Sequence, residues 1–133
     1  MKLLTKLVCC SVACASLSLT TLAAFAETCP ARQEFHANPT GDKMTLVTSS
    51  GWTLRLPSQD DIIGGFVRAT ASASRHMQSC RYRINFTSDQ EAGADRTGLH
   101  NASLNNDNDK WGEDGSGGFE CVSLNDPSQC HFQ

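Results

Sequence analysis

The sequence has no excess of positive charge, and this limits what the protein can bind. Lysine and arginine together number 11, against 14 aspartate and glutamate residues in a chain of 133. Domains that bind nucleic acid usually carry a surplus of basic residues on one face. The sequence therefore predicts that nucleic acid is not a partner.

Paired cysteine motifs, internal repeats and linkers are also missing. None of the seven cysteines belongs to a Cys-x-x-Cys pair, the spacing that many zinc sites and thioredoxin-like redox motifs use. His76 and Cys80 have helical spacing but no further partner in the pattern. The cysteines are therefore expected to be structural, and the chain to contain one domain.

A long apolar run occurs once, at the N-terminus, and it has the three parts of an export signal. Two lysines begin it, residues 7–22 are apolar or small, and residues 24–26 (Ala-Phe-Ala) supply a small-x-small cleavage pattern. Serine and threonine dilute the run, which makes a retained membrane-spanning helix the weaker alternative. We predict that residues 1–26 are a cleavable signal peptide and residues 27–133 a single exported domain.

The exported domain would be short and acidic. It has 107 residues, and its nine basic and fourteen acidic residues give a formal net charge of −5, because two lysines leave with the leader. This length suits one domain and leaves no room for two.

The alternation typical of strands is clearest at residues 80–87. Cys80, Tyr82, Ile84 and Phe86 are expected to face one way, and the polar residues between them the other. This segment is the best strand of the sequence.

A hairpin and a further strand are predicted before it. Residues 44–48 and 52–57 flank a Ser-Ser-Gly turn at residues 49–51. Residues 66–71 suit a strand, with a helix over residues 69–77 as the main alternative because alanine and serine allow both.

Residues 88–118 are mostly polar and rich in glycine. Only residues 99–104 offer a short strand within them, and a last strand is predicted around residues 119–124. Long irregular stretches in a small domain are usually functional or mobile. The predicted fold is all-β: a small, disulfide-stapled antiparallel sandwich or barrel of about five to seven short strands.

Four cysteines remain after the leader, and an even number in a short exported domain predicts two disulfides. Pairing Cys29 with Cys80 would tie the N-terminal segment to the best strand. Cys121 and Cys130 flank a turn-rich segment and form the other favoured pair. The crossed pairing, Cys29 with Cys121 and Cys80 with Cys130, stays open.

Arginine and tryptophan supply the candidate ligand-binding residues. Arg68, Arg81 and Arg83 would form one basic stripe for a phosphate or carboxylate if their strands are neighbours. Trp52 and Trp111 could stack on a sugar. The commoner alternatives are a solvated surface for the arginines and the core for the tryptophans.

The segment 107–114 supplies the candidate metal ligands. Asp107, Asp109 and Glu113 place oxygen atoms around a glycine, faintly as in a calcium loop. Trp111 stands where the next ligand belongs, so we expect no cofactor and keep calcium as the alternative.

The same segment supplies the alternative of an enzyme. A small secreted hydrolase would need His100 or His131 within hydrogen-bond reach of Glu113 or Asp114 in a concave pocket. No spacing in the sequence selects one histidine as a base.

Six short motifs follow one another along the exported domain: Cys29-Pro30, Gly51-Trp52, Gly-Phe-Val-x-Ala at residues 65–69, Cys80-Arg81-Tyr82, Trp111 and the ending from Cys121 to Phe132. In this order they resemble a family of small exported proteins of gammaproteobacteria, including Legionella-like intracellular species, known only as a domain of unknown function. The resemblance implies a bacterial, disulfide-bonded envelope or secreted protein. It assigns no catalytic residue.

These observations predict an exported, periplasmic or secreted module that is not an enzyme and binds a protein, a glycan or an anionic ligand. No membrane span is expected after signal cleavage. The first alternative is the hydrolase built on residues 107–114 and a histidine. The second is a structural envelope component, which would show an exposed apolar patch or an edge strand able to pair with another chain.

Overall fold

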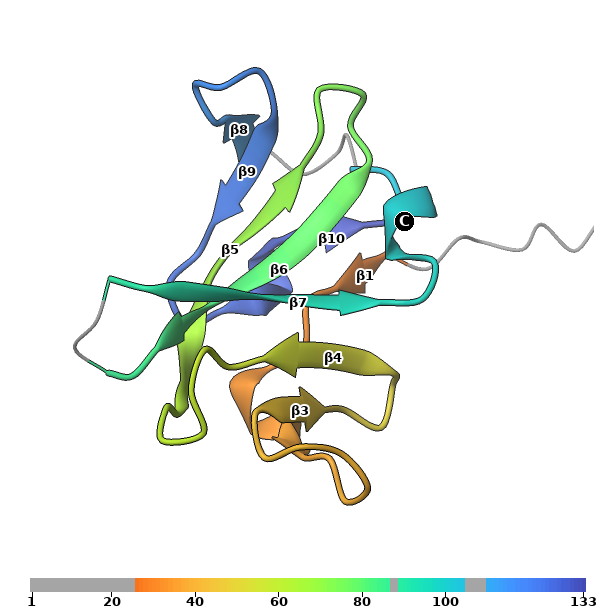
Figure 1. The fold of residues 1–133 in the computed structure, drawn as a ribbon. Coiled ribbons are helices and arrows are strands. Elements are labelled where there is room, and N and C mark those ends of the chain that lie inside the picture. Colours follow the sequence, from red (N-terminus) through yellow and green to blue (C-terminus); the bar gives the residue numbers. More distant parts are fainter. Residues whose placement is uncertain (1–25, 87–88, 105–109) are drawn as a thin grey trace, which may run out of the picture.

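The structure, a computed structural model, describes residues 26–86, 89–104 and 110–133 (Figure 1). Its strands are β1 (Glu27–Thr28), β2 (His36–Ala37), β3 (Thr45–Val47), β4 (Trp52–Arg55), β5 (Ile63–Ala71), β6 (Met77–Ile84), β7 (Glu91–Arg96), β8 (Trp111–Glu113), β9 (Phe119–Val122) and β10 (His131–Phe132). Three short 3₁₀ helices connect them: η1 (Arg32–Glu34), η2 (Leu99–Asn101) and η3 (Pro127–Gln129). No helix in these ranges has the length and apolar character needed to cross a membrane.

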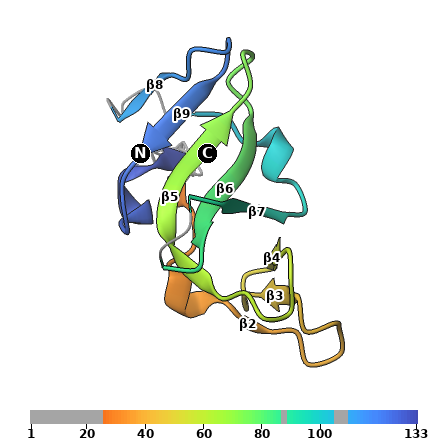
Figure 2. The same cartoon turned by 60° about the vertical axis from the view of Figure 1, so that its left-hand side comes forward.

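The strands pair in two antiparallel sheets. Eight form one sheet in the order β2-β3-β4-β7-β6-β5-β9-β8, and β1 pairs with β10 in the other. Figure 2 shows β8 and β9 toward one edge of the large sheet and β3 and β4 toward the other. The small sheet lies behind β5 and β6 in Figure 1, and the ring centroids of Trp52 and Phe132 are 6.4 Å apart across the core. The predicted all-β, disulfide-stapled fold is confirmed, and a sandwich fits it.

The predicted hairpin and the predicted strand after it are present. β3 and β4 pair across residues 49–51, where Gly51 has a φ of 88°. β5 continues through Ala71, so the strand, and not the alternative helix, forms over residues 66–71. Burial alternates along its second half, where Ala69 and Ala71 lie in the core.

The alternation predicted for β6 ends earlier than expected. Ile84 is fully buried, but the side chain of Phe86 is 59% exposed. Between them Asn85 has a φ of 57°, a left-handed conformation that ends the strand. The Asn85 side chain holds this turn by donating to Asp61 and accepting the backbone N–H of Ile62. The prediction that Phe86 faces the same way as Tyr82 and Ile84 is therefore wrong.

Two segments within the polar stretch also differ from prediction. Residues 91–96, expected to be irregular, form β7, which pairs with both β4 and β6. Ala92 and Ala94 are small enough to be buried in the middle of the sheet. Residues 99–104 were expected to form a strand, but they form η2 and two isolated bridges, after Gly98 turns the chain with a φ of 82°. Residues 91–96 form a strand because they pair with a strand on each side, which outweighs their weak local preference for the strand conformation.

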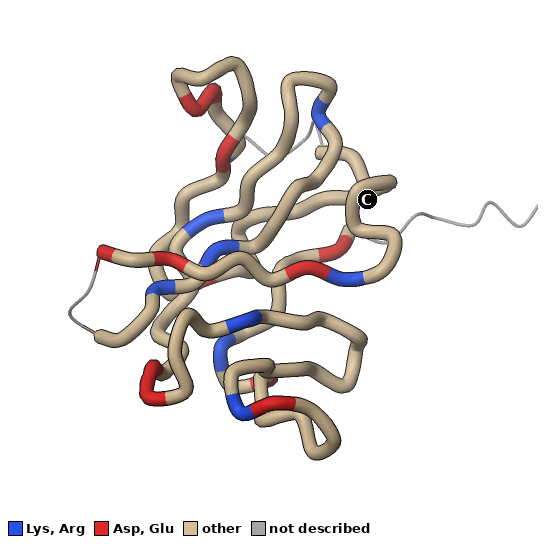
Figure 3. Tube along the Cα trace, viewed as in Figure 1, with Lys and Arg blue, Asp and Glu red and all other residues tan. Residues whose placement is uncertain are grey.

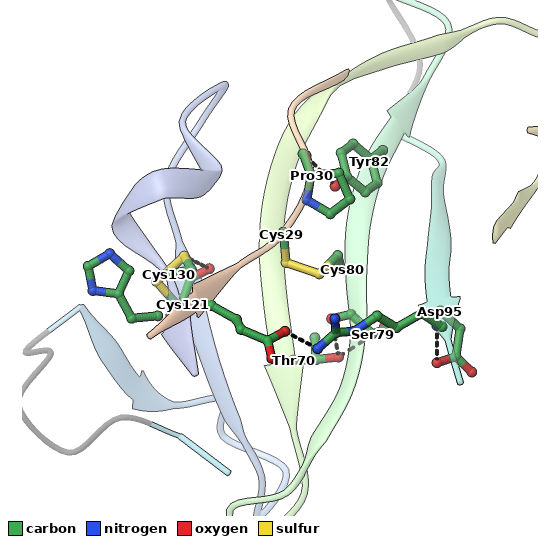
Figure 4. The surroundings of a disulfide bond; sticks show 12 residues. Cys29, Pro30, Thr70, Ser79, Cys80, Tyr82, Asp95, Cys121 and Cys130 are labelled. Atoms are coloured by element: carbon green, nitrogen blue, oxygen red, sulfur yellow. Dashed lines mark hydrogen bonds and ion pairs between the residues drawn. A yellow bond between two sulfur atoms is a disulfide. The ribbon is translucent and has the colours of Figure 1, made fainter. Parts of the chain in front are cut away.

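Both favoured disulfides are present, Cys29 with Cys80 and Cys121 with Cys130. All four cysteines are buried. The first bridge attaches the N-terminal segment to β6. The second closes the short loop that leads from β9 to β10 (Figure 4).

A buried tyrosine strengthens the first attachment. The Tyr82 hydroxyl donates to the carbonyl of Pro30 at 2.6 Å (Figure 4). Its ring meets Phe35 and Phe66 edge to face, with centroid distances of 5.1 and 5.6 Å. Burial raises the pKa of Tyr82 well above its usual value, so the hydroxyl remains a donor.

Removing the longer disulfide should destabilise the protein more than removing the shorter one. The chain-entropy model gives about 4 kcal/mol for the bridge between residues 51 apart and about 2.7 kcal/mol for the bridge between residues 9 apart. We expect the double alanine variant of Cys29–Cys80 to have the lower free energy of unfolding in urea, followed by the fluorescence of the two tryptophans, of which Trp52 is buried. Equal losses in the two double variants would contradict the entropic origin of the difference.

Replacing Tyr82 with phenylalanine tests the second attachment. Tyr82→Phe leaves the Pro30 carbonyl buried without its donor, which should lower the free energy of unfolding by about 1–3 kcal/mol. Because the folded pKa is raised, the wild-type tyrosine contributes stability that is present below about pH 10 and lost above it. Tyr82 is the sole tyrosine of the chain, so tyrosinate absorbance reports it alone. Ionisation near pH 10 in the folded protein would refute the buried hydrogen bond.

Candidate functional site

Two arginines of the predicted stripe lie side by side but are paired with carboxylates. Arg68 on β5 is opposite Arg81 on β6. Arg68 contacts Glu91 at 3.1 Å and Glu120 at 2.9 Å, and Arg81 contacts Glu91 at 3.4 Å. The hydrogen bond to Glu120 is the main reason that the pKa of Arg68 is raised. Figure 3 shows these basic positions on β5 and β6 beside acidic positions on neighbouring strands.

This network joins strands and leaves little uncompensated positive charge for an anion to bind. Glu91 lies on β7 and Glu120 on β9, so the ion pairs with Arg68 and Arg81 connect four neighbouring strands of the large sheet. An added anion would meet two carboxylates as well as two guanidinium groups. The network therefore acts first as a cross-strand support.

Arg83 is in a different situation from the other two arginines. Glu91 is its cross-strand neighbour on β7, but within the described ranges the Arg83 guanidinium forms no ion pair or hydrogen bond. It lines a depression of about 220 Å³ together with Phe86, Leu124 and the backbone of Gly65. A cation without a partner therefore stands beside exposed apolar side chains.

A second depression lies on the same surface and shares Gly65, Phe66, Phe86 and Asn125 with the first. Its volume is about 280 Å³, and Arg32 of η1 forms part of its wall. The Arg32 guanidinium lies 4.8 Å from the centroid of the Phe86 ring and has no carboxylate partner in the part of the chain described. We call the two depressions together the Phe86 groove, lined by Ala31, Arg32, Gln33, Gly65, Phe66, Val67, Arg83, Phe86, Leu124, Asn125 and Pro127.

Unusual backbone positions build the groove. A Cβ atom on Gly65 would lie 1.8 Å from the Asn125 side-chain oxygen, so any larger residue there would displace the Asn125 side chain. Asn125 has a φ of 62°, and its backbone N–H donates to the carbonyl of Phe66 at 2.8 Å. The left-handed Asn85 directs Phe86 outward. The groove is therefore held by main-chain conformation and hydrogen bonds before any ligand binds.

Among the described residues, four large apolar side chains are exposed, and two of them, Phe86 and Leu124, line the Phe86 groove. The four are Ile62 (48% exposed), Phe86 (59%), Val122 (51%) and Leu124 (64%). The Ile62 carbonyl accepts the backbone N–H of Asn85, and the Ile62 N–H donates to the Asn85 side chain, next to Phe86. Val122 precedes Leu124 by two residues. Single exposed apolar residues are common, but a group of them beside a groove is typical of an interaction site.

The two tryptophans do not form the predicted sugar platform. Trp52 is 3% exposed and lies under the guanidinium of Arg96, 5.2 Å from the ring centroid. A ligand cannot reach its face, so the prediction for Trp52 is wrong. Trp111 is half-buried on β8, and its indole N–H donates to the carbonyl of His131 at 2.9 Å.

The predicted calcium ligands are only partly visible. Asp107 and Asp109 lie outside the described residues, and Glu113 is exposed on β8. Asp114 accepts hydrogen bonds from the backbone and hydroxyl of Ser116, which lower the pKa of its carboxyl. Within the described ranges, no three His, Cys, Asp or Glu side chains are grouped to hold a metal ion.

The histidine that the hydrolase hypothesis needs is engaged elsewhere. Nδ1 of His100 lies 3.0 Å from the carbonyl of Met77, and Nε2 lies 3.1 Å from the carboxylate of Asp95. These acceptors raise the pKa of His100, the Met77 carbonyl most, and favour a cation with both nitrogens donating. In the ranges described, neither His100 nor His131 is hydrogen-bonded to residues 113–114. Within the described residues, the histidine and the carboxylate that a hydrolase would need are therefore not brought together.

Sequence reasoning did not select most of the groove. It placed Phe86 on the same strand face as Tyr82 and Ile84 and gave no role to Arg32 or Leu124. The local signal was an asparagine directly beside an apolar residue, at Asn85-Phe86 and at Leu124-Asn125. Asparagine tolerates left-handed backbone and can turn the next or preceding side chain out of the sheet.

Comparison of the chain with protein-family models, with curated proteins and with solved structures gave no match. The resemblance to the exported gammaproteobacterial family therefore stays a prediction.

Proposed function

We propose that the protein is an exported, non-enzymatic binding module whose ligand is an anion with an apolar body, held in the Phe86 groove. One observation carries the proposal: Arg32 and Arg83 flank an exposed Phe86, and neither forms an ion pair in the described ranges, although Glu91 lies opposite Arg83 in the β6–β7 pairing. The same fold neutralises Arg68 with two carboxylates. The difference makes the groove, and not the network on the sheet, the better place for an anion.

The two kinds of side chain act on different parts of such a ligand. A guanidinium group binds a carboxylate or phosphate through paired N–H donors. The apolar body of the ligand would cover Phe86 and Leu124. Removing their surface from water contributes about 25 cal/mol of binding free energy per Å² of apolar area. Because the groove is preformed, little ordering is needed on binding.

Two other functions receive less support. A glycan-binding role has lost its platform, since Trp52 is buried. A structural envelope role would also need an exposed apolar patch, and Phe86 and Leu124 belong to one. Arginines without partners favour a charged ligand over a purely structural contact.

Export is supported by the covalent framework. Two buried disulfides are compatible with an oxidising compartment such as the periplasm or the exterior of a cell. The N-terminal leader pattern points the same way.

Phenylpropionate, a small carboxylate with an aromatic body, is a direct probe of this function. We expect it to shift the amide resonances of groove residues in an NMR titration of the disulfide-bonded protein, and its uncharged amide to bind about tenfold more weakly. Arg83→Gln should weaken binding of the carboxylate by about the same factor.

Arg55→Gln is the matched control, because Arg55 is exposed, lies 3.4 Å from Asp42 and lines neither depression. It should leave binding unchanged. Equal affinity for the acid and the amide, or shifts outside the Phe86 groove, would refute the proposal.

A further inference from the structure

Resting on the proposed function, we infer that the occupant of the Phe86 groove is a segment of another protein that carries acidic side chains next to leucine or phenylalanine. The shape of the groove, the apolar surface outside it and the balance of charge around it favour this class of partner.

The shape favours a chain of side chains over one compact ligand. Sites for small molecules usually enclose about 300–1,000 Å³. The two depressions measure about 220 and 280 Å³ and share Phe86, so the Phe86 groove reaches that volume only for a ligand that spans both hollows. Two small hollows beside one aromatic residue suit two side chains of the same polypeptide.

The apolar surface extends past the groove. Ile62 and Val122 are each about half exposed, yet neither lines either depression. A ligand confined to the hollows would leave both side chains in water. A polypeptide that continues beyond Leu124 or Phe86 would cover them, and this is the gain that a free small carboxylate cannot obtain.

The charges select an acidic partner. Arg32 and Arg83 contribute two positive groups without carboxylate partners in the described ranges. The exported domain as a whole has a formal net charge of −5, which opposes docking on an extended anionic membrane surface. A short acidic segment meets the local cations without approaching the rest of the acidic surface.

The same argument disfavours a second copy of this chain. A symmetric contact would place the same patch on both sides of the interface. Arg32 and Arg83 of one copy would then approach those of the other, and like charges in contact are unfavourable.

The test begins with selection from a random peptide library displayed on phage, using the disulfide-bonded protein as bait. We expect the enriched sequences to combine aspartate or glutamate with leucine or phenylalanine. A basic consensus, or no enrichment over a Phe86→Ser bait, would overturn the inference.

An enriched peptide, made synthetically, is then compared with phenylpropionate by calorimetry or NMR. Arg32→Gln and Arg83→Gln should each weaken peptide binding by about tenfold. Ile62→Ser should weaken binding of the peptide several-fold and leave phenylpropionate unchanged, because Ile62 lies outside the hollows. Arg55→Gln should affect neither ligand.

The outcomes separate the two proposals. Suppose that phenylpropionate binds, that the peptide binds no more tightly, and that Ile62→Ser leaves the affinity for the peptide unchanged. The proposed function then stands and the peptide partner is wrong. If neither binds, both are wrong. Binding to phosphatidylglycerol vesicles at physiological ionic strength, or a dimer that Phe86→Ser dissociates, would replace the peptide with a membrane or a second copy.

Discussion

The structure depends on the attachment of its N-terminal segment to the middle of β6. The Cys29–Cys80 disulfide and the hydrogen bond from Tyr82 to Pro30 make this attachment within two adjacent residues of the segment. Phe35, just after η1, packs on the Tyr82 ring. The short helix η1 is thus held on both sides, although three residues of 3₁₀ helix have little stability alone. A small domain buries too little surface to hold such a segment by packing alone.

That attachment also positions the candidate site. Arg32 belongs to η1, and its guanidinium reaches the Phe86 ring because the residues before and after it are anchored. The opposite wall comes from the turn after β9, where Asn125 fits over Gly65. Covalent, aromatic and main-chain constraints therefore meet around one groove, which is the part of the described surface where exposed apolar side chains and unpaired cations coincide.

Arginines only a few residues apart have different roles in this fold. Arg68 and Arg81 are held by Glu91, which lies on a strand that the polar sequence did not predict, and Arg68 also by Glu120, 52 residues further along the chain. Arg83 lies two residues beyond Arg81, at the end of β6, and no carboxylate of the described ranges reaches it. Exposed ion pairs contribute little stability, so the main effect of the network is to neutralise one part of the face and leave the charge of another part available.

The sequence by itself predicted an export signal and determined the all-β class, the β3–β4 hairpin and the presence of two disulfides, while their pairing was left open until the structure. These depend on local features: composition, alternation over a few residues, turn residues and the number of cysteines. Only the tertiary structure decided that β7 forms, that Trp52 is buried, that Phe86 is exposed and that Arg83 lacks a partner. Each of these depends on which strands become neighbours, and a period of two says which residues share a face without saying what lies opposite them.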